Sequence, residues 1–449
     1  MDLKNKKVTV IGMGVSNTPL VRWLMERGAE VTVRDRKSFD QLSPEAEQLI
    51  DEGVKLISGE DYLSGLDGDV IFRTPGLRFD TPEIAKAVAG GSLLTSEMEL
   101  FFELCPAHIV AVTGSDGKTT TTTIISKLLE NAGRVYVGGN IGKPLLCDVE
   151  KMTKDDWAVI ELSSFQLHTM TRSPEIAVVT NLSPNHLDYH RGMEEYIEAK
   201  KNIFLHQKPG DKLVLNKKNG VTFSFADEAC AGVEVLFFNG DGGEEVYERD
   251  GTIWYGAERV LDTDEILLPG HHNVENYMAA IAATYPIVGA EPIQSLARTF
   301  GGVEHRMELV ARKKGVTYYN SSIDSSPTRT TAALSSFSEK VIVILGGYDK
   351  HIPFDPLAAP LCKHCKLAIL TGDTAQKIHD AVVDSEEYEK SPFPMITVKN
   401  FDDAVAEAAL QAEEGDIVVL SPACASFDAF PNFMERGKRF KNIVSSLED

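Results

Sequence analysis

An alternation of apolar strands with helices begins three times along this chain of 449 residues. The first run opens with a strand predicted at 7–11 and a glycine turn, the second with a strand at 108–113, and the third near 304–310. Strands joined by helical crossovers lie parallel in one sheet, with the helices on its faces. The pattern therefore predicts an α/β chain of three domains, at 1–95, 96–302 and 303–449, the first and last of them Rossmann-like.

The acidic composition limits the partners that we expect. Lys and Arg number 45 against 67 Asp and Glu, which gives a formal net charge of −22. Such a surface repels a phosphate backbone, so we expect no nucleic-acid partner. A small anionic ligand is not excluded, because a few lysines or a helix N-terminus can form a local positive pocket. The hydrophobic fraction of 43% is ordinary for a folded protein and argues against wholesale disorder.

Cysteine usage and hydropathy indicate a protein of the cytoplasm. The six cysteines lie scattered, unlike the dense disulfide framework of a small secreted domain. No run of 18 apolar residues occurs, and the first residues lack the pattern of a cleaved signal, so we expect an uncleaved chain without a membrane span. We also expect a monomer. Cys362 and Cys365 suggest zinc, but no second pair stands at a spacing that would complete a four-ligand site.

A glycine-rich loop after the strand at 108–113 predicts a nucleotide site. Its two glycines let backbone amides approach phosphate oxygens, Lys118 can reach the β- and γ-phosphates, and Thr119 offers a hydroxyl to Mg²⁺. Val112 stands where a strict P loop has its first glycine, and a glycine turn with an incidental lysine is the alternative. The position between strand and helix favours a nucleoside triphosphate. The residues expected to bind it are Gly114, Ser115, Asp116, Gly117, Lys118, Thr119 and Thr120.

Two further predicted strands end in residues that suit a metal-assisted phosphoryl transfer. Glu161 closes the strand at 157–162, and His186, Asp188 and His190 follow the next strand. The carboxyl ends of parallel strands meet at one edge of a sheet, where α/β proteins bind their ligands. Oxygen and imidazole groups at that edge can hold Mg²⁺ between nucleotide and substrate. Taken singly, each of these residues would be an ordinary surface or hydrogen-bonded side chain.

The motifs, taken in order, resemble those of the Mur ligase family over essentially the whole chain. Ten blocks carry the resemblance, and their order is more specific than any one of them. They are GMGVSN (12–17), TGSDGKTT (113–120), GGNIGKP (138–144), ELSSFQL (161–167), NLSPNHLDYH (181–190), EAKKNIF (198–204), GHHNVEN (270–276), EHRMELV (304–310), GGYDK (346–350) and LSPACASFDAF (420–430). The resemblance implies that the N-terminal domain binds a UDP-linked substrate, the central domain is a P-loop ATPase type, and the C-terminal domain binds an amino acid.

Within the family, the motifs look like those of the ligases that add D-glutamate to UDP-N-acetylmuramoyl-L-alanine in peptidoglycan precursor synthesis. This implies ATP-dependent amide ligation through an acyl phosphate, because phosphorylation supplies the leaving group that a carboxylate lacks. It also implies two Mg²⁺ ions, one on Thr119 and Glu161 and the second on His186 and a carbamylated Lys200. The catalytic residues implied are Lys118, His186, Lys200 and Lys350.

The resemblance further implies which residues bind each reactant. Beyond the P loop, those for ATP are Asn273, Asn276 and Arg306. Those for the UDP-linked substrate are Val15, Ser16, Asp35, Arg36, Thr74, Gly76, Asn140 and Gln166. Those for D-glutamate are Ser325, Lys350, Ser426 and Phe433.

The chain departs from the family pattern at 320–326, which reads NSSIDSS where the family commonly has NDSKATN. Ser321 replaces an aspartate that the resemblance places at the ATP ribose, Ile323 replaces a lysine, and Ser325 keeps a hydroxyl in place of a threonine. Asp324 is the nearest carboxylate that can compensate for Ser321, although it lies three positions further along the chain.

Several alternatives remain open at this point. The loop at 12–17 with Asp35 resembles part of a dinucleotide fingerprint, but Asn17 occupies the place of the third glycine. Other members of the family add L-alanine, a diamino acid or a dipeptide, or act as folylpolyglutamate synthetases; the first and last blocks favour the D-glutamate enzyme. A catalytically silent sensor of UDP-muramoyl precursors is favoured only by Ser321.

Overall fold

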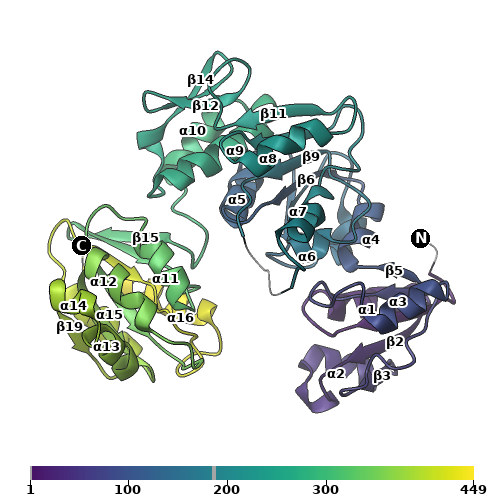
Figure 1. Ribbon diagram of the computed structural model, residues 1–449, viewed down its shortest axis with the longest axis horizontal. Helices are drawn as coiled ribbons and strands as arrows, with labels where there is room; N and C mark the ends of the chain where they lie inside the picture. The colour runs from purple at the N-terminus through teal and green to yellow at the C-terminus, as the bar shows by residue number, and fades with distance from the viewer. Residues whose placement is uncertain (1–2, 185–188, 449) are drawn as a thin grey trace. The chain divides into compact units, whose positions relative to one another are not determined.

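The computed structural model describes residues 3–184 and 189–448 of the chain (Figure 1). It contains two compact units, one formed by residues up to 263 together with 274–296, the other by 264–273 together with 297–449. Three sheets are present, one within each of the three predicted domains, and the domain boundaries at 95/96 and 302/303 stay predictions. Within the described residues, no helix is both long and apolar enough to cross a membrane.

The first sheet is parallel throughout and has the order β3-β2-β1-β4-β5. Val8 and Val10 of β1 pack with α1 and α2 on one face, while Ile11 and Ile71 pack with α3 on the other. The order reverses at β1, and doubly wound sheets bind ligands at such a point, beyond the carboxyl ends of the strands. The elements are β1 (Lys7–Ile11), α1 (Asn17–Glu26), β2 (Glu30–Asp35), α2 (Pro44–Asp51), β3 (Lys55–Ser58), β4 (Val70–Phe72), α3 (Pro82–Ala89) and β5 (Leu93–Thr95).

The second sheet has nine strands in the order β14-β13-β12-β11-β10-β9-β6-β8-β7. The seven strands β12, β11, β10, β9, β6, β8 and β7 pair in parallel with their neighbours. At the β14 edge of the sheet, β12, β13 and β14 form an antiparallel meander. The strands are β6 (His108–Thr113), β7 (Val135–Gly139), β8 (Trp157–Glu161), β9 (Ile176–Val179), β10 (Lys212–Asn216), β11 (Glu234–Phe238), β12 (Val246–Arg249), β13 (Thr252–Tyr255) and β14 (Glu258–Asp262). The helices are α4 (Glu97–Leu104), α5 (Lys118–Leu129), α6 (Ser164–Leu167), α7 (Met193–Lys201), α8 (Gly220–Ser224), α9 (His271–Val288) and α10 (Ala290–Thr299).

The third sheet has the order β15-β16-β20-β17-β18-β19, parallel except for the β15–β16 hairpin. Its central strands are almost wholly apolar, as expected for a parallel sheet buried on both faces. The strands are β15 (Glu308–Lys313), β16 (Val316–Asn320), β17 (Val341–Gly346), β18 (Cys365–Thr371), β19 (Met395–Thr397) and β20 (Ile417–Leu420). The helices are α11 (Pro327–Leu334), α12 (Ala358–His364), α13 (Ala375–Val383), α14 (Glu386–Lys390), α15 (Phe401–Gln411) and α16 (Phe433–Ser446).

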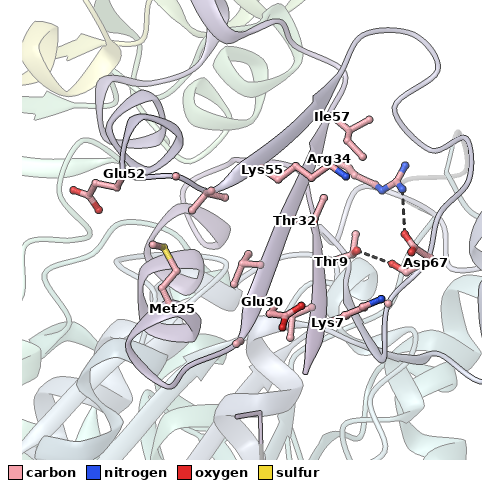
Figure 2. A pocket seen from close by; sticks show the side chains of 16 residues that line it. Lys7, Thr9, Met25, Glu30, Thr32, Arg34, Glu52, Lys55, Ile57 and Asp67 are labelled. Atoms are coloured by element: carbon pink, nitrogen blue, oxygen red, sulfur yellow. Dashed lines mark hydrogen bonds and ion pairs between the residues drawn. The ribbon is translucent and has the colours of Figure 1, made fainter. Parts of the chain in front are cut away.

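A pocket of about 460 Å³ opens on the N-terminal sheet (Figure 2). Its lining includes Lys7, Glu30 and Lys55, the first residues of three strands, whereas the loop at 12–17 follows the carboxyl end of β1. Arg34 lies in this pocket and donates to the carbonyls of Tyr62, Ser64 and Gly65. We assign the pocket no part in the candidate site described below.

Candidate nucleotide and substrate site

The loop between β6 and α5 needs glycine at two positions. Gly114 and Gly117 have φ angles of +146° and +77°, which residues with a side chain rarely adopt. A Cβ on Gly114 would collide with Thr180 Oγ1, and one on Gly117 with Asn276 Oδ1. The backbone therefore passes close to two neighbouring segments, and the loop opens directly into the N-terminus of α5. This is the geometry in which backbone amides bind phosphate oxygens.

Three predicted residues meet at the carboxyl end of β8. Glu161 is 1% exposed; its Oε2 accepts a hydrogen bond of 2.7 Å from Thr119 Oγ1, and its Oε1 accepts one of 2.7 Å from Asn140 Nδ2. Thr119 is in the first turn of α5, and Lys118 Nζ turns back to the Ser115 carbonyl at 2.8 Å. The hydroxyl of Thr119 and the carboxylate of Glu161 are oxygen ligands of the kind that Mg²⁺ takes. Asn140, predicted at the UDP-linked substrate, holds the other carboxylate oxygen.

Lys200 lies buried beneath the same loop. Its Nζ donates to Thr113 Oγ1 at 3.0 Å and to the Gly114 carbonyl at 2.9 Å, and the residue is 2% exposed. Burial lowers the pKa of Lys200 well below its ordinary value, and the nearby charge of Lys118 lowers it further. This shift favours the neutral amine, which is the form that reacts with CO₂. Lys201 points elsewhere and pairs with Glu198 and Glu228.

The segment that follows β9 braces the loop from the other side. Asn181 Oδ1 accepts from the Asp116 amide at 3.0 Å, and Thr180 Oγ1 donates to the Asp116 carbonyl at 2.6 Å. Ser115 Oγ bonds to Tyr196 Oη at 2.9 Å, so α7 also contacts the loop. Thr180, Asn181 and Tyr196 were not among the predicted site residues, although Asn181 opens one of the ten blocks. His186 and Asp188, predicted near this segment, lie outside the described residues.

The remaining residues predicted for ATP are dispersed along the chain. Thr120 is half-buried on α5. Asn276, on α9, accepts a hydrogen bond of 3.2 Å from Thr121 of α5. Asn273 donates to the Pro269 carbonyl at 2.7 Å. The Arg306 amide donates to the Val303 carbonyl. The structure thus brings Asn276 to α5, while nucleotide contacts of Asn273 and Arg306 stay predictions.

The loop after β1 is held by side chains rather than by a third glycine. Buried Asn17 donates from Nδ2 to the carbonyls of Ile11 and Gly12, each at 3.0 Å. The Asp35 carboxylate accepts from the amides of Met13 and Lys37 at 2.6 and 2.8 Å. These bonds give both residues a structural role in holding the loop.

Of the other residues predicted for the UDP-linked substrate, Thr74 contacts this loop, while Gln166 lies on α6. Val15 is 79% exposed, Ser16 precedes α1, and Arg36 pairs with Glu60 at 3.1 Å. Thr74 lies beside the loop, because a Cβ built on Gly12 would be 3.3 Å from its side chain. Gly76 has open space around it, and Gln166 Oε1 accepts from the Ser163 amide at 3.0 Å.

In the C-terminal unit, the predicted D-glutamate residues follow the carboxyl ends of the central strands. Lys350, after β17, lies with Nζ 3.4 Å from Ser325 Oγ. Ser426 is buried after β20, and its carbonyl accepts from the Phe430 amide at 2.7 Å. The Phe433 carbonyl accepts from Ser322 Oγ at 2.8 Å. The structure therefore brings Lys350 to Ser325, while Phe433 is joined to the segment after β16 through its backbone.

The variant block at 320–326 forms a buried polar cluster in this unit. Asp324 Oδ2 accepts from Ser421 Oγ at 2.9 Å, and Ser321 Oγ accepts from the Met307 amide at 3.2 Å. Burial raises the pKa of Asp324 to about 6, and hydrogen bonds from Ser321 and Ser421 oppose this shift. The Asp324 amide also donates to the Ser321 carbonyl at 2.9 Å, so the two positions are joined through the backbone.

Comparison with known proteins gives matches along the whole chain. Three family models match: the N-terminal domain of MurD-like Mur ligases at 6–95, the Mur ligase middle domain at 112–284, and the glutamate ligase domain of Mur ligases at 305–424. The chain is 49% identical to the UDP-N-acetylmuramoylalanine–D-glutamate ligase of Acetivibrio thermocellus, covering 99% of this chain and 97% of that protein. It is 50% identical to the ligase of the same name from Clostridium beijerinckii, covering 98% and 97%. The chain belongs to the Mur ligase family.

Solved structures of other Mur ligases share the fold. MurF from Acinetobacter baumannii has a TM-score of 0.58 at 14% identity, covering 98% of this chain and 92% of that one. UDP-N-acetylmuramate-alanine ligase from Thermotoga maritima has a TM-score of 0.57 at 18% identity, covering 98% and 100%. Mur ligases are ATP-dependent enzymes. The P loop of this Mur ligase and its Thr119–Glu161 pair suit that nucleotide and its magnesium.

A second group of possible metal ligands in this Mur ligase is hydrogen-bonded to an arginine. Among the described residues, His168, His190 and Glu195 form the one group of three with ligand atoms within 4.8 Å of one another. Arg78 donates to both oxygens of Glu195, at 2.7 and 3.0 Å, and holds the pKa of that carboxyl at about 2. Burial lowers the pKa of His190 to about 4. A divalent ion here would lie against a guanidinium, so we interpret the group as structural.

Proposed function

We propose that this chain is an ATP-dependent ligase that joins D-glutamate to UDP-N-acetylmuramoyl-L-alanine, in the cytoplasmic synthesis of the peptidoglycan precursor. The observation that carries the proposal is identity of 49–50% over nearly the whole length to ligases that bear this name. The P loop, Glu161 and Lys200 supply the chemistry that such a ligase requires. A monomeric state is part of the proposal.

The reaction begins at the P loop. The substrate carboxylate attacks the γ-phosphorus of ATP, a P–O bond to ADP breaks, and an acyl phosphate forms. Lys118 is released from the Ser115 carbonyl and neutralises charge on the phosphate oxygens, as the loop amides do. Magnesium, when bound, offsets the phosphate charge further, and Thr119 and Glu161 are the residues that would hold it.

Lys200 acts as a second anionic group after modification. Its neutral amine adds to CO₂, an N–C bond forms, a proton leaves, and a carbamate results. The carbamate would stand where Nζ now contacts Thr113 and Gly114, close to the Thr119–Glu161 pair. With His186 it would hold a second Mg²⁺ ion.

The second half of the reaction uses the C-terminal unit. Lys350 and Ser325 bind the carboxylates of D-glutamate, with Ser426 and Phe433 completing the site. The D-glutamate amine attacks the acyl carbon, the C–O bond to phosphate breaks and the nitrogen loses a proton. Inorganic phosphate leaves and the amide is formed. Val15, Ser16, Asp35, Arg36, Thr74, Gly76, Asn140 and Gln166 bind the UDP-linked substrate, and the loop at 114–120, Asn273, Asn276 and Arg306 bind ATP.

The direct test is phosphate release from ATP with Mg²⁺ and UDP-N-acetylmuramoyl-L-alanine. We expect release with D-glutamate and none with L-glutamate, L-alanine or a diamino acid. Mass spectrometry of the product then identifies the amide. Binding of the UDP-linked substrate without turnover on any acceptor would contradict the proposal and would favour a silent sensor.

A further inference from the structure

One buried arginine joins two segments that the proposed function assigns to the same substrate. Arg73 follows β4 and is 1% exposed. Its Nη1 donates to the carbonyls of Pro75 and Leu77, at 3.1 and 3.0 Å, within its own loop. Its Nη2 donates to the Phe165 carbonyl at 3.0 Å and to Thr169 Oγ1 at 3.1 Å, the first within α6 and the second just after it. A single planar group thus sets the distance between the loop after β4 and α6.

The burial of this guanidinium is costly, and it is compensated mainly by neutral oxygens. Burial lowers the pKa of Arg73, while the nearby charge of Glu99 opposes that shift. Burial also raises the pKa of Glu99 to about 7. The planar guanidinium donates its hydrogen bonds in fixed directions, which an apolar side chain of the same volume cannot do. The arrangement therefore defines geometry more than it adds stability.

The same loop has a second attachment. Arg78 Nη1 donates to the Tyr189 carbonyl at 2.8 Å and pairs with Glu195 at the start of α7, while Tyr189 Oη donates to the Pro75 carbonyl at 3.2 Å. Residues 73–78 are therefore held both to α6 and to the segment that leads into α7. Asn202, two positions after Lys200, in turn donates to the Leu167 carbonyl of α6 at 2.9 Å.

We propose that Arg73 is a positioning residue for the UDP-muramoyl substrate, which holds Thr74 and Gly76 at a set distance from Gln166. This inference rests on the proposed function, because it takes those three residues as contacts of one ligand. Arg73 itself is buried and acts through its two attached segments. Through α6 and Asn202, it also relates the substrate loop to the helix that carries Lys200.

The test compares Arg73→Met and Arg73→Lys with Arg34→Met. Arg34 is a matched control, because it is also a buried guanidinium that donates to backbone carbonyls of the same domain, but its carbonyl partners lie at 62–65 and not on α6. We expect Arg73→Met to raise KM for the UDP-linked substrate by about tenfold or more, because a displacement near 1 Å can cost that much. KM for ATP and for D-glutamate should change by less than about twofold. Arg34→Met should lower the melting temperature without this selective effect.

Two further measurements separate positioning from folding. Calorimetric binding of the UDP-linked substrate without ATP should weaken in Arg73→Met, and methylguanidinium should restore part of the affinity in Arg73→Ala. Unchanged KM and affinity in a folded Arg73→Met variant would overturn the proposal, as would a parallel loss in all three substrates. Wild-type turnover is measured first, so that failure of the proposed function appears there and not in the variants.

Discussion

At the scale of single residues, burial distinguishes two adjacent lysines. Lys200 contacts Thr113 and Gly114 in the interior, whereas Lys201 pairs with two glutamates. We expect Lys200→Ala to lower kcat by about a thousandfold or more, because the proposed carbamate and the metal charge that it balances are lost. Short carboxylates should restore part of the activity. Lys201→Ala is the control and should retain kcat within about twofold; steady-state assays with and without added acetate measure both.

Removal of bicarbonate offers an independent check on the same residue. Wild-type enzyme purged of CO₂ should lose activity and regain it when bicarbonate is added. Full activity of Lys200→Ala, or no response of the wild type to CO₂, would show that Lys200 is not modified.

Glu97, in the first turn of α4, provides a prediction on pH. Burial raises the pKa of Glu97 to about 7 from 4.5, while the Leu146 amide donates to its Oε1 at 3.1 Å. The pKa of Glu97 is higher in the folded state than in the unfolded state. The contribution of protonated Glu97 to the free energy of unfolding is therefore complete below pH 4.5 and is lost as pH rises through about 7. Glu97→Gln keeps the hydrogen-bond acceptor without the charge. Its free energy of unfolding should equal that of the wild type at low pH and exceed it by about 1–3 kcal/mol near pH 8.

Urea unfolding at several pH values measures this difference. Glu103→Gln, at an exposed position of the same helix, is the matched control and should stay within about 0.5 kcal/mol of wild type. A difference between Glu97→Gln and wild type that does not grow with pH would contradict the prediction.

At the scale of elements, the turn into α5 depends on a glycine. Gly117 precedes the helix with φ +77°, and a Cβ there would meet Asn276 of α9. We expect Gly117→Ala to lower the free energy of unfolding by about 1–3 kcal/mol, because both strain and collision oppose it. ATP affinity should fall as well, since the loop amides would move; denaturation and nucleotide titration measure the two effects.

The control for this turn is Gly220→Ala. Gly220 starts α8, a Cβ added to it would meet no atom within 4 Å, and its φ is not positive. Alanine there should leave stability unchanged or raise it by a few tenths of a kcal/mol. Equal effects of the two substitutions would show that the turn before α5 has no special demand for glycine.

At the scale of the whole molecule, the two compact units can be followed separately. The three tryptophans, Trp23, Trp157 and Trp254, all belong to the first unit, whereas far-ultraviolet circular dichroism reports on both. The UDP-linked substrate alone should stabilise the first unit by about 2.7 kcal/mol at a hundredfold excess over Kd, since its proposed contacts all lie there. Tryptophan fluorescence should then shift further in denaturant than the circular dichroism signal; coincident shifts would contradict the assignment.

The sequence by itself determined the fold class and the location of the nucleotide loop. Strand and helix periods arise from neighbouring residues, so the strands at 7–11 and 108–113 were predicted at their observed bounds. The P loop was likewise predicted between strand and helix because its chemistry needs a local run of residues. The strands β5, β7, β12, β14 and β19 were not predicted, since their apolar runs are only two or three residues long.

Only the tertiary structure decided which side chains meet. Asn140 was predicted at the UDP-linked substrate but bonds to Glu161, 21 positions away, and the bridge from Arg73 to Phe165 spans 92 positions. The buried contacts of Lys200 and of Asp324 with residues far along the chain also had no local signal. The Asn140–Glu161 and Asp324–Ser421 pairs join the ends of neighbouring strands of one sheet, whereas the Arg73–Phe165 bond joins segments that follow strands of two different sheets. Their positions depend on packing between distant segments, which no local period in the sequence records.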